Sequence, residues 1–380
     1  MNLALVLIAS TLAQPNPPGV VIDHSPAVSG MYVGSPALAV LPSGEYVASH
    51  DFFGPESNEF QSARSVVFRS ADRGEKWERI AEIQGAFWSS LFVHRDRLYL
   101  LGTDRHHGNI VIRRSEDGGV TWTSPKDRTT GLLRDTGECH CAPVPVLEHD
   151  GRLWRAFEWR NPPIAWGINY RSGMLSVAVD ADLLNASNWT FSNFLPSDRE
   201  WNRGDMGAWL EGNAVVAPDA TLVNLLRVQT KSPQEKAAIV RLSANGQVAT
   251  FDPDHDFIDF PGGAKKFTIR FDPITKKYWT LATILHEKHR ATNPGGIRNT
   301  LALNCSADLR HWEVRTVILY DPGVAKHGFQ YVDWLFEGQD LIAVCRTAFD
   351  DATGGAHNNH DANYLTFHRI CNFRDLKDVR

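Results

Sequence analysis

The sequence has little of what marks several common classes of protein. Five cysteines in 380 residues are too few, and odd in number, for a fold built on disulfide bonds. A net charge of −5 offers no general basic surface, so we expect no nucleic-acid partner. No apolar run is long enough to cross a membrane. The chain does have 43% hydrophobic residues and 12 tryptophans, which is enough for a large core.

The N-terminus has the pattern of an export signal. An apolar run at residues 3–13 ends in small residues, which favours cleavage before Gln14. The run is too short to span a bilayer. We therefore expect residues 1–13 to be a signal peptide and residues 19–380 to form a single domain. The mature protein is then expected to be secreted or periplasmic, and monomeric.

A turn motif of the form S-x-D-x-G-x-x-W occurs after two apolar strands. The two copies lie at residues 70–77 and 115–122, and residues 306–312 form a copy that is one residue shorter. The Asp carboxylate can accept hydrogen bonds from its own turn, the Gly can adopt positive φ, and the Trp covers the turn. We interpret these motifs as structural hairpin turns and not as catalytic groups.

One strand pattern recurs six times along the chain. Each repeat has an apolar strand, a turn, a second strand, a polar loop, and a third strand that leads into the turn motif or a remnant of it. Four-stranded repeats of roughly 40–60 residues predict an all-β fold, a six-bladed β-propeller. A seventh blade, the less favoured alternative, would need strands within residues 125–138 or 193–206. Residues 20–22 would supply the last strand and close the ring, which removes free sheet edges.

The order of strands and turns in each repeat places the turn motifs and the expected site at opposite ends of the strands. Starts of first strands, ends of second strands and starts of third strands should converge at the other end of the sheets. That end is rich in arginine, which binds carboxylates, and in histidine, which transfers protons near neutral pH. The acid–base candidates are His50, His107 and His140. The substrate-binding candidates are Arg105, Trp88, Arg160, Tyr170, Arg298, Gln330, Arg346, His357 and His360.

Two further segments bear on the site. The loop at residues 350–363 is long, polar and rich in glycine, and loops on a rigid scaffold usually carry function. Cys139, His140 and Cys141 would give part of a metal site, although two buried cysteines at a strand start are the simpler interpretation. Apart from that segment we expect no cofactor.

The turn motifs and the repeats resemble the sialidase superfamily of β-propellers over nearly the whole chain after the signal peptide. The resemblance implies an acid Asp in the first repeat, a Glu in the fourth and a nucleophilic Tyr in the sixth. Asp51, Glu211 and Tyr331 stand at similar places. The arginine that the family carries on the first strand is missing, because residues 33–36 read Val-Gly-Ser-Pro.

Other stretches are similar to a divergent propeller group that includes α-L-rhamnosidases acting on rhamnose–glucuronate linkages and ulvan lyases. They are residues 32–36, 49–51, 102–105, 139–146, 328–333 and 357–363. This resemblance implies histidine chemistry on an acidic oligo- or polysaccharide, by hydrolysis or by β-elimination. We therefore expect a carbohydrate-active enzyme, a glycoside hydrolase or polysaccharide lyase, in which histidine carries the reaction. The alternatives are an exo-α-sialidase that uses Tyr331, Glu211 and Asp51, and a glycan-binding propeller without activity.

Overall fold

The computed structural model describes residues 16–160, 167 and 169–377, so the predicted signal peptide lies outside the described residues. Helical structure in these ranges is limited to 3-10 turns of three residues. They are η1 (Ala27–Ser29), η2 (Ala186–Asn188), η3 (Glu287–His289), η4 (Pro294–Gly296) and η5 (Phe373–Asp375). No helix in the described part of the chain is long and apolar enough to cross a membrane.

The strands form antiparallel groups in chain order. The first three groups are β2 (Tyr32–Val33), β3 (Ala37–Val40), β4 (Tyr46–Phe53), β5 (Arg64–Ser70) and β6 (Glu78–Gln84); β7 (Phe87–His94), β8 (Arg97–Thr103), β9 (Gly108–Ser115) and β10 (Leu132–His140); and β11 (Leu147–His149), β12 (Arg152–Arg160), β13 (Tyr170–Ala178), β14 (Trp189–Phe191) and β15 (Leu195–Pro196). The next three are β16 (Met206–Val216), β17 (Leu222–Thr230), β18 (Lys236–Leu242), β19 (Ala249–Thr250) and β20 (Phe257–Asp259); β21 (Phe267–Asp272), β22 (Lys277–Thr283), β23 (Thr300–Ser306) and β24 (Glu313–Tyr320); and β25 (Gly328–Glu337), β26 (Asp340–Ala348), β27 (Tyr364–Ile370) and β1 (Val20–His24).

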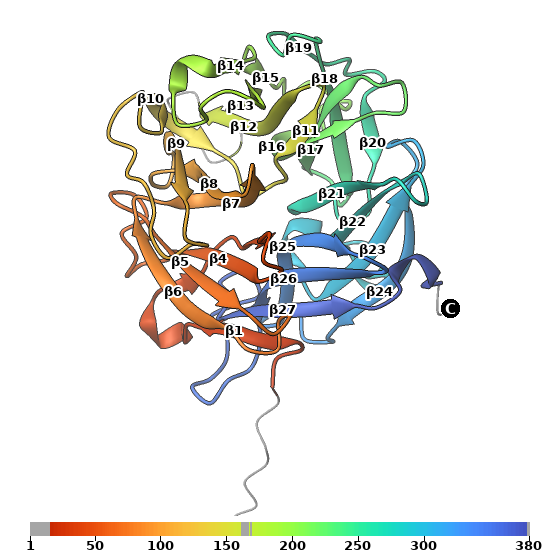
Figure 1. The fold of residues 1–380 in the computed structure, drawn as a ribbon. Coiled ribbons are helices and arrows are strands. Elements are labelled where there is room, and N and C mark those ends of the chain that lie inside the picture. The colour runs from red at the N-terminus through yellow and green to blue at the C-terminus, as the bar shows by residue number, and fades with distance from the viewer. Residues whose placement is uncertain (1–15, 161–166, 168, 378–380) are drawn as a thin grey trace, which may run out of the picture.

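These groups follow the repeats predicted from the sequence, and Figure 1 shows them arranged around a ring. The fold is a β-propeller of the predicted all-β class. The second and third groups are joined into one nine-stranded sheet, because β10 continues far enough to pair with β12. Strands do occur near the segments that a seventh blade would need, but β10 pairs with β9 and β12, and β15 pairs with β13, so both belong to the groups already described.

The N-terminal strand closes the ring, as the sequence predicted. β1 pairs antiparallel with β27, with Val20 opposite Phe367 and His24 opposite Tyr364. The red strand β1 and the blue strand β27 therefore lie side by side in Figure 1. Gly19 is required at this closure because its φ is +87° and a Cβ would lie 2.5 Å from the carbonyl oxygen of Phe367.

Neighbouring sheets pack face to face through apolar side chains. In one such cluster Trp154 and Met174 of the third group pack with Trp209 and Leu226 of the fourth, and all four are buried. Burial of apolar surface at about 25 cal/mol per Å² holds the sheets at fixed spacing. The inner strand β3 lies against β7 and β25, and β21 lies against β16 and β25. The strand ends on the inside of the ring are therefore held in fixed positions.

The turn motifs have the hydrogen bonds expected of them. The Asp117 carboxylate accepts from the backbone N–H of Thr121 at 2.9 Å, and the indole of Trp122 donates to the carbonyl of Gly119 at 2.8 Å. Asp72 has the equivalent bond from the N–H of Lys76. β4 and β5 run antiparallel, with Tyr46 opposite Ser70. The Asp72 turn therefore lies at the opposite end of the sheet from Asp51, as predicted.

Candidate active site

A small pocket of about 150 Å³ lies where inner strands begin and the second strands end. It is lined by Gly34, Ser35, Asp51, Phe53, Phe87, Trp88, His106, His140, Glu211, Tyr331, Arg346 and His360. A larger cavity of about 890 Å³ lies near the other ends of the strands and is apolar apart from Glu148, Arg270 and Lys276. We place the candidate site in the smaller pocket, because titratable and aromatic groups converge there.

Three side chains in the pocket project from the same kind of backbone irregularity. The pairing of inner strand with second strand shifts register between Phe87 and Ser90, between Leu210 and Asn213, and between Gln330 and Asp333. Each shift marks a β-bulge, which re-aims a side chain. The residues at the bulges are Trp88, Glu211 and Tyr331, with φ of 46°, 57° and 54°.

Positive φ is unfavourable for these three residue types. Such a backbone costs about 1–3 kcal/mol and persists where the surrounding structure requires it, commonly at active sites. The bulges occur in the second, fourth and sixth strand groups. The strain at Trp88, Glu211 and Tyr331 therefore marks these positions as functional candidates.

Asp51 is a buried carboxylic acid on the wall of the pocket. Its Oδ1 accepts the N–H of Ser35 at 2.8 Å and its Oδ2 accepts the N–H of Trp88 at 2.6 Å. Burial raises the pKa of Asp51 to about 6, although these two N–H groups act in the opposite direction. A carboxyl group with such a pKa gains and loses its proton close to neutral pH, which suits an acid–base catalyst.

Glu211, Arg227 and Tyr331 form one polar cluster. The Nη1 of Arg227 donates to Oε2 of Glu211 at 2.7 Å. Burial raises the pKa of Glu211, but Arg227 and His140 outweigh burial and hold that pKa below its usual value. Burial lowers the pKa of Arg227, but the charge of Glu211 and a hydrogen bond that Arg227 donates to Tyr331 hold it above its usual value. Glu211 is therefore ionised beside a buried guanidinium that also reaches Tyr331.

Two more buried arginines border this cluster. Arg346 lies with its guanidinium 4.4 Å from the ring centre of Phe53 and 4.8 Å from that of Tyr331. Its Nε is buried and has no hydrogen-bond partner in the described part of the chain. Arg298 donates to Oε1 of Gln330 at 2.7 Å. Burial lowers the pKa of Arg298 to about 10, and the charges of Arg227 and Arg346 act in the same direction.

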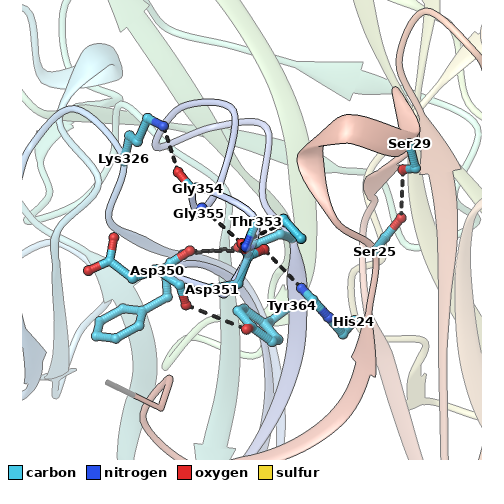
Figure 2. A network of polar contacts seen from close by, with 12 residues as sticks. His24, Ser25, Ser29, Lys326, Asp350, Asp351, Thr353, Gly354, Gly355 and Tyr364 are labelled. Carbon is cyan, nitrogen blue, oxygen red and sulfur yellow. Dashed lines mark hydrogen bonds and ion pairs between the residues drawn. The ribbon is translucent and has the colours of Figure 1, made fainter. Parts of the chain in front are cut away.

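The loop at residues 350–363 is tied to the pocket at one end and to the N-terminal strand at the other. Gln330 donates to the carbonyl oxygens of Asn359 and His360, and Arg346 donates to that of His360. Figure 2 shows the other anchor, where His24 reaches Asp351 and Tyr364 lies against the His24 ring. In the same view Lys326 donates to the carbonyl of Gly354. The loop therefore holds His360 at the pocket.

The predicted histidines occupy different places. His140 lines the pocket, and its Nδ1 lies 2.9 Å from Oε2 of Glu158. Burial lowers the pKa of His140 to about 3 and raises that of Glu158 to about 8. His107 is buried against the Tyr170 hydroxyl, and burial strongly lowers its pKa. Neither His107 nor Tyr170 lines the pocket.

His50 lies behind the pocket. Its Nδ1 lies 2.8 Å from the carbonyl oxygen of Asp51, and its Nε2 lies 2.8 Å from Oδ2 of Asp23. Its ring packs against Phe52 and Phe68 and is 1% exposed. Both ring nitrogens therefore already have partners in the protein, and the ring supports the strand that carries Asp51.

The remaining predicted binding residues also separate into two groups. Arg346, Trp88 and His360 line the pocket, and Arg298 and Gln330 border it. The others lie outside its lining: Arg105 pairs with Asp104, Arg160 pairs with Glu138, and the exposed His357 stacks on Tyr32.

Several lining residues were missing from the sequence-based candidates, namely Gly34, Ser35, Phe53, Phe87 and His106. Arg227 does not line the pocket but holds Glu211, and it too was absent from the candidates. Gly34 has a visible role, because a Cβ there would lie 1.6 Å from Oδ1 of Asp51. His106 stands next to the predicted His107, and strand alternation alone does not show which of two neighbours faces inward.

The two cysteines of residues 139–141, where the sequence raised a metal site, lie in apolar surroundings. Within the described ranges, no group of three or more His, Cys, Asp or Glu side chains is arranged to hold a metal ion. Cys139 and Cys141 are free and buried, within the apolar cluster of the second and third strand groups. Burial raises the pKa of the Cys139 thiol to about 12, so it is not a thiolate at neutral pH.

The comparisons with known proteins agree on the fold. No model of a known protein family matches the chain, and neither does any curated protein sequence. Among solved structures, the Hadza microbial sialidase Hz136 superimposes with a TM-score of 0.61 at 13% identity, covering 93% of this chain and 68% of that one. The α-L-arabinanase of Penicillium chrysogenum, complexed with arabinobiose, gives 0.57 at 13% identity, covering 95% and 100%. The leech intramolecular trans-sialidase gives 0.55 at 12% identity, covering 97% and 71%. The chain therefore has the sialidase-like β-propeller fold.

Proposed function

We propose that the protein is a glycoside hydrolase that releases a terminal sugar carrying a carboxylate. The observation that supports this most strongly is the gathering of Arg227, Arg298 and Arg346, all buried, around Tyr331. Buried guanidinium groups bind carboxylates by charge-assisted, often bidentate hydrogen bonds. The first inner strand has no arginine to bind the carboxylate, and Arg346, from the sixth strand group, takes that role. Sialidases among the structural neighbours are consistent with an acidic sugar.

The proposed reaction uses a tyrosine nucleophile in place of the histidine expected from the sequence. Tyr331 attacks the anomeric carbon and passes its phenolic proton to Glu211, while Asp51 gives a proton to the departing oxygen. In the second step water attacks the anomeric carbon while Asp51 takes a proton from it, the bond from that carbon to the Tyr331 oxygen breaks, and Glu211 returns the proton to Tyr331. Arg227 stabilises the ionised form of Glu211, which these two reaction steps require.

The size of the pocket supports action on a chain end. Its volume of about 150 Å³ is below the range of ~300–1,000 Å³ usual for drug-sized ligands, so one sugar ring fills it. We therefore propose exo-cleavage. Secretion and a monomeric state remain proposals that derive from the sequence, and mass spectrometry of the exported protein's N-terminus tests the first of them.

His140 supports a second candidate, β-elimination at a uronate. It is the one acid–base histidine proposed from the sequence that lines the pocket, and it is neutral there, although burial lowers its pKa to about 3 and so makes it a weak base. Elimination leaves an unsaturated uronate, which absorbs in the ultraviolet, whereas hydrolysis leaves a saturated sugar.

One experiment separates these candidates. Purified protein is incubated with terminal sialosides, terminal glucuronides, rhamnose-capped glucuronate glycans and ulvan, and the products are identified by NMR. A saturated acidic monosaccharide supports the hydrolase proposal. An unsaturated product supports elimination through His140. Binding without turnover of any acidic glycan supports a glycan-binding protein and contradicts both candidates.

A further inference from the structure

We propose that Phe60 and His106 form a stacking platform for the sugar ring on the leaving-group side of the cleaved bond. This inference rests on the proposed glycosidase function and adds a second binding position to it. Phe60 belongs to the loop between β4 and β5, and His106 to the loop between β8 and β9. Two loops from adjacent strand groups thus meet at one side of the pocket.

Aromatic rings lead without interruption from the pocket to the surface. Trp88 and His106 line the pocket, with ring centres 4.5 Å apart. The Phe60 ring stacks on the outer side of His106, at 4.5 Å between centres and 23° between planes. Phe60 is 66% exposed, so one face of the stack is open to solvent. A ring bound in the pocket and a ring bound on Phe60 would be neighbours in one chain.

The platform is held in place before any ligand arrives. The backbone N–H of His106 donates to the carbonyl of Glu59 at 2.6 Å, and its Nδ1 lies 2.8 Å from Oε1 of Glu59. The other carboxylate oxygen of Glu59 accepts from the N–H of Gly54 and from the hydroxyl of Ser57. Glu59 itself is buried. A preorganised aromatic surface loses little conformational entropy when a ligand binds.

The chemistry of the platform suits a pyranose ring. The C–H groups on one face of a pyranose are apolar and pack on an aromatic ring, while the hydroxyl groups at its edge stay hydrated. A stack of this kind contributes about three- to tenfold in affinity. The exposed Phe60 would therefore lower KM for substrates whose leaving group is a sugar, and would leave KM unchanged for substrates whose leaving group is methyl.

The test compares Phe60→Ala, Phe60→Trp and the wild type on two substrates with the same acidic terminal sugar. One substrate carries a hexose as leaving group and the other carries methyl. We expect Phe60→Ala to raise KM for the hexose-linked substrate about fivefold and to leave the methyl glycoside unchanged, and Phe60→Trp to restore the wild-type value. Equal changes on both substrates, or no change on either, would overturn the platform.

Tyr320 provides a matched control. It is also an exposed aromatic residue packed on a histidine, His286, but it lies outside the pocket lining. Tyr320→Ala should change neither KM. If the wild type turns over no acidic glycoside, the proposed function fails separately, and saturation-transfer NMR with the hexose-linked disaccharide then tests the platform. Signal on the hexose ring that is lost in Phe60→Ala supports it, and no signal in the wild type overturns it.

Discussion

Glu211 and Tyr331 occupy the same position in two strand groups of the ring. Each follows an inner-strand residue that pairs with an arginine on the second strand, Leu210 with Arg227 and Gln330 with Arg346. Each stands at a β-bulge, and φ is 57° at Glu211 and 54° at Tyr331. The repeat therefore delivers Glu211, Tyr331 and Arg346 to one pocket, with Arg227 bound to Glu211, through the same kind of bulge that also carries Trp88.

Gly34 should be essential for the position of Asp51. Gly34→Ala puts a Cβ 1.6 Å from Oδ1 of Asp51, so we expect kcat to fall at least tenfold as the carboxyl group is displaced. Gly296→Ala is the matched control, because nothing lies within 4 Å of a Cβ there. Steady-state kinetics on the best acidic glycoside is the measurement. Full activity of Gly34→Ala would contradict the role given to Asp51.

Activity should depend on a protonated Asp51. Because burial raises its pKa to about 6, the acid form persists to higher pH than an ordinary aspartic acid would allow. We expect kcat/KM to fall as pH rises through about 6, approaching tenfold per pH unit. The same proton adds to the stability of the fold at low pH, and that contribution is lost as pH rises through about 6. A leaving group that needs no protonation should abolish this limb of the profile, and a limb that persists would exclude Asp51 as the acid.

Arg346 should distinguish charged from neutral substrates. Loss of a hydrogen bond to a charged group costs about 1.5–3 kcal/mol, so Arg346→Met should raise KM for a carboxylate substrate by about 10- to 100-fold. The matching carboxamide substrate should bind weakly to the wild type and no worse to the variant. Since Arg346 is buried, added salt should have a small effect on KM. Equal losses on both substrates would indicate a structural role only.

The Asp117 turn should affect stability and not catalysis. Its carboxylate accepts hydrogen bonds from the N–H groups of Val120 and Thr121 and from the hydroxyl groups of Ser115 and Thr121. Burial raises the pKa of Asp117, but the bonds from Thr121 and Ser115 outweigh burial and keep that pKa at about 2. Asp117→Ala should lower the free energy of unfolding by about 1–2 kcal/mol and leave kcat/KM unchanged. The stabilisation should be lost as pH falls towards 2.

Urea unfolding measures this change, and Asp135→Ala, at another exposed aspartate, is the control. An Asp117→Ala protein that unfolds like the wild type would remove the structural role of the motif. One that keeps its stability but loses turnover would instead assign the turn to the active site.

The architecture was predictable because each repeat has a recognisable pattern of apolar strands and turn residues. The turn at Asp117 and the closing strand β1 were predicted from local patterns, which survive in a single sequence. The site was predicted less well because it depends on which of two neighbours faces the pocket. His50 and Asp51 point to opposite faces of β4, as do His106 and His107 at the next loop.

The arginine cluster was predicted only in part, since Arg298 and Arg346 were among the predicted binding residues but their gathering around Tyr331 was not foreseen. A missing arginine on the first strand suggested a weakened anion site, but Arg346 reaches the pocket from the sixth group. The bulge at Tyr331 also leaves no clear mark in the sequence, since it shifts the register without a glycine, whereas Gly212 follows Glu211 at the other bulge. These features depend on packing between segments that are distant in the chain.

The turnover number of Tyr331→Phe, measured beside His50→Gln and His107→Gln on the same acidic glycoside, distinguishes tyrosine catalysis from histidine catalysis. Tyr331→Phe keeps the ring under the Arg346 guanidinium and removes only the hydroxyl. We expect kcat of Tyr331→Phe to fall by about 10³-fold or more, while both histidine variants stay within about tenfold of the wild type. A Tyr331→Phe protein that still turns over, together with a histidine variant that does not, would contradict this expectation.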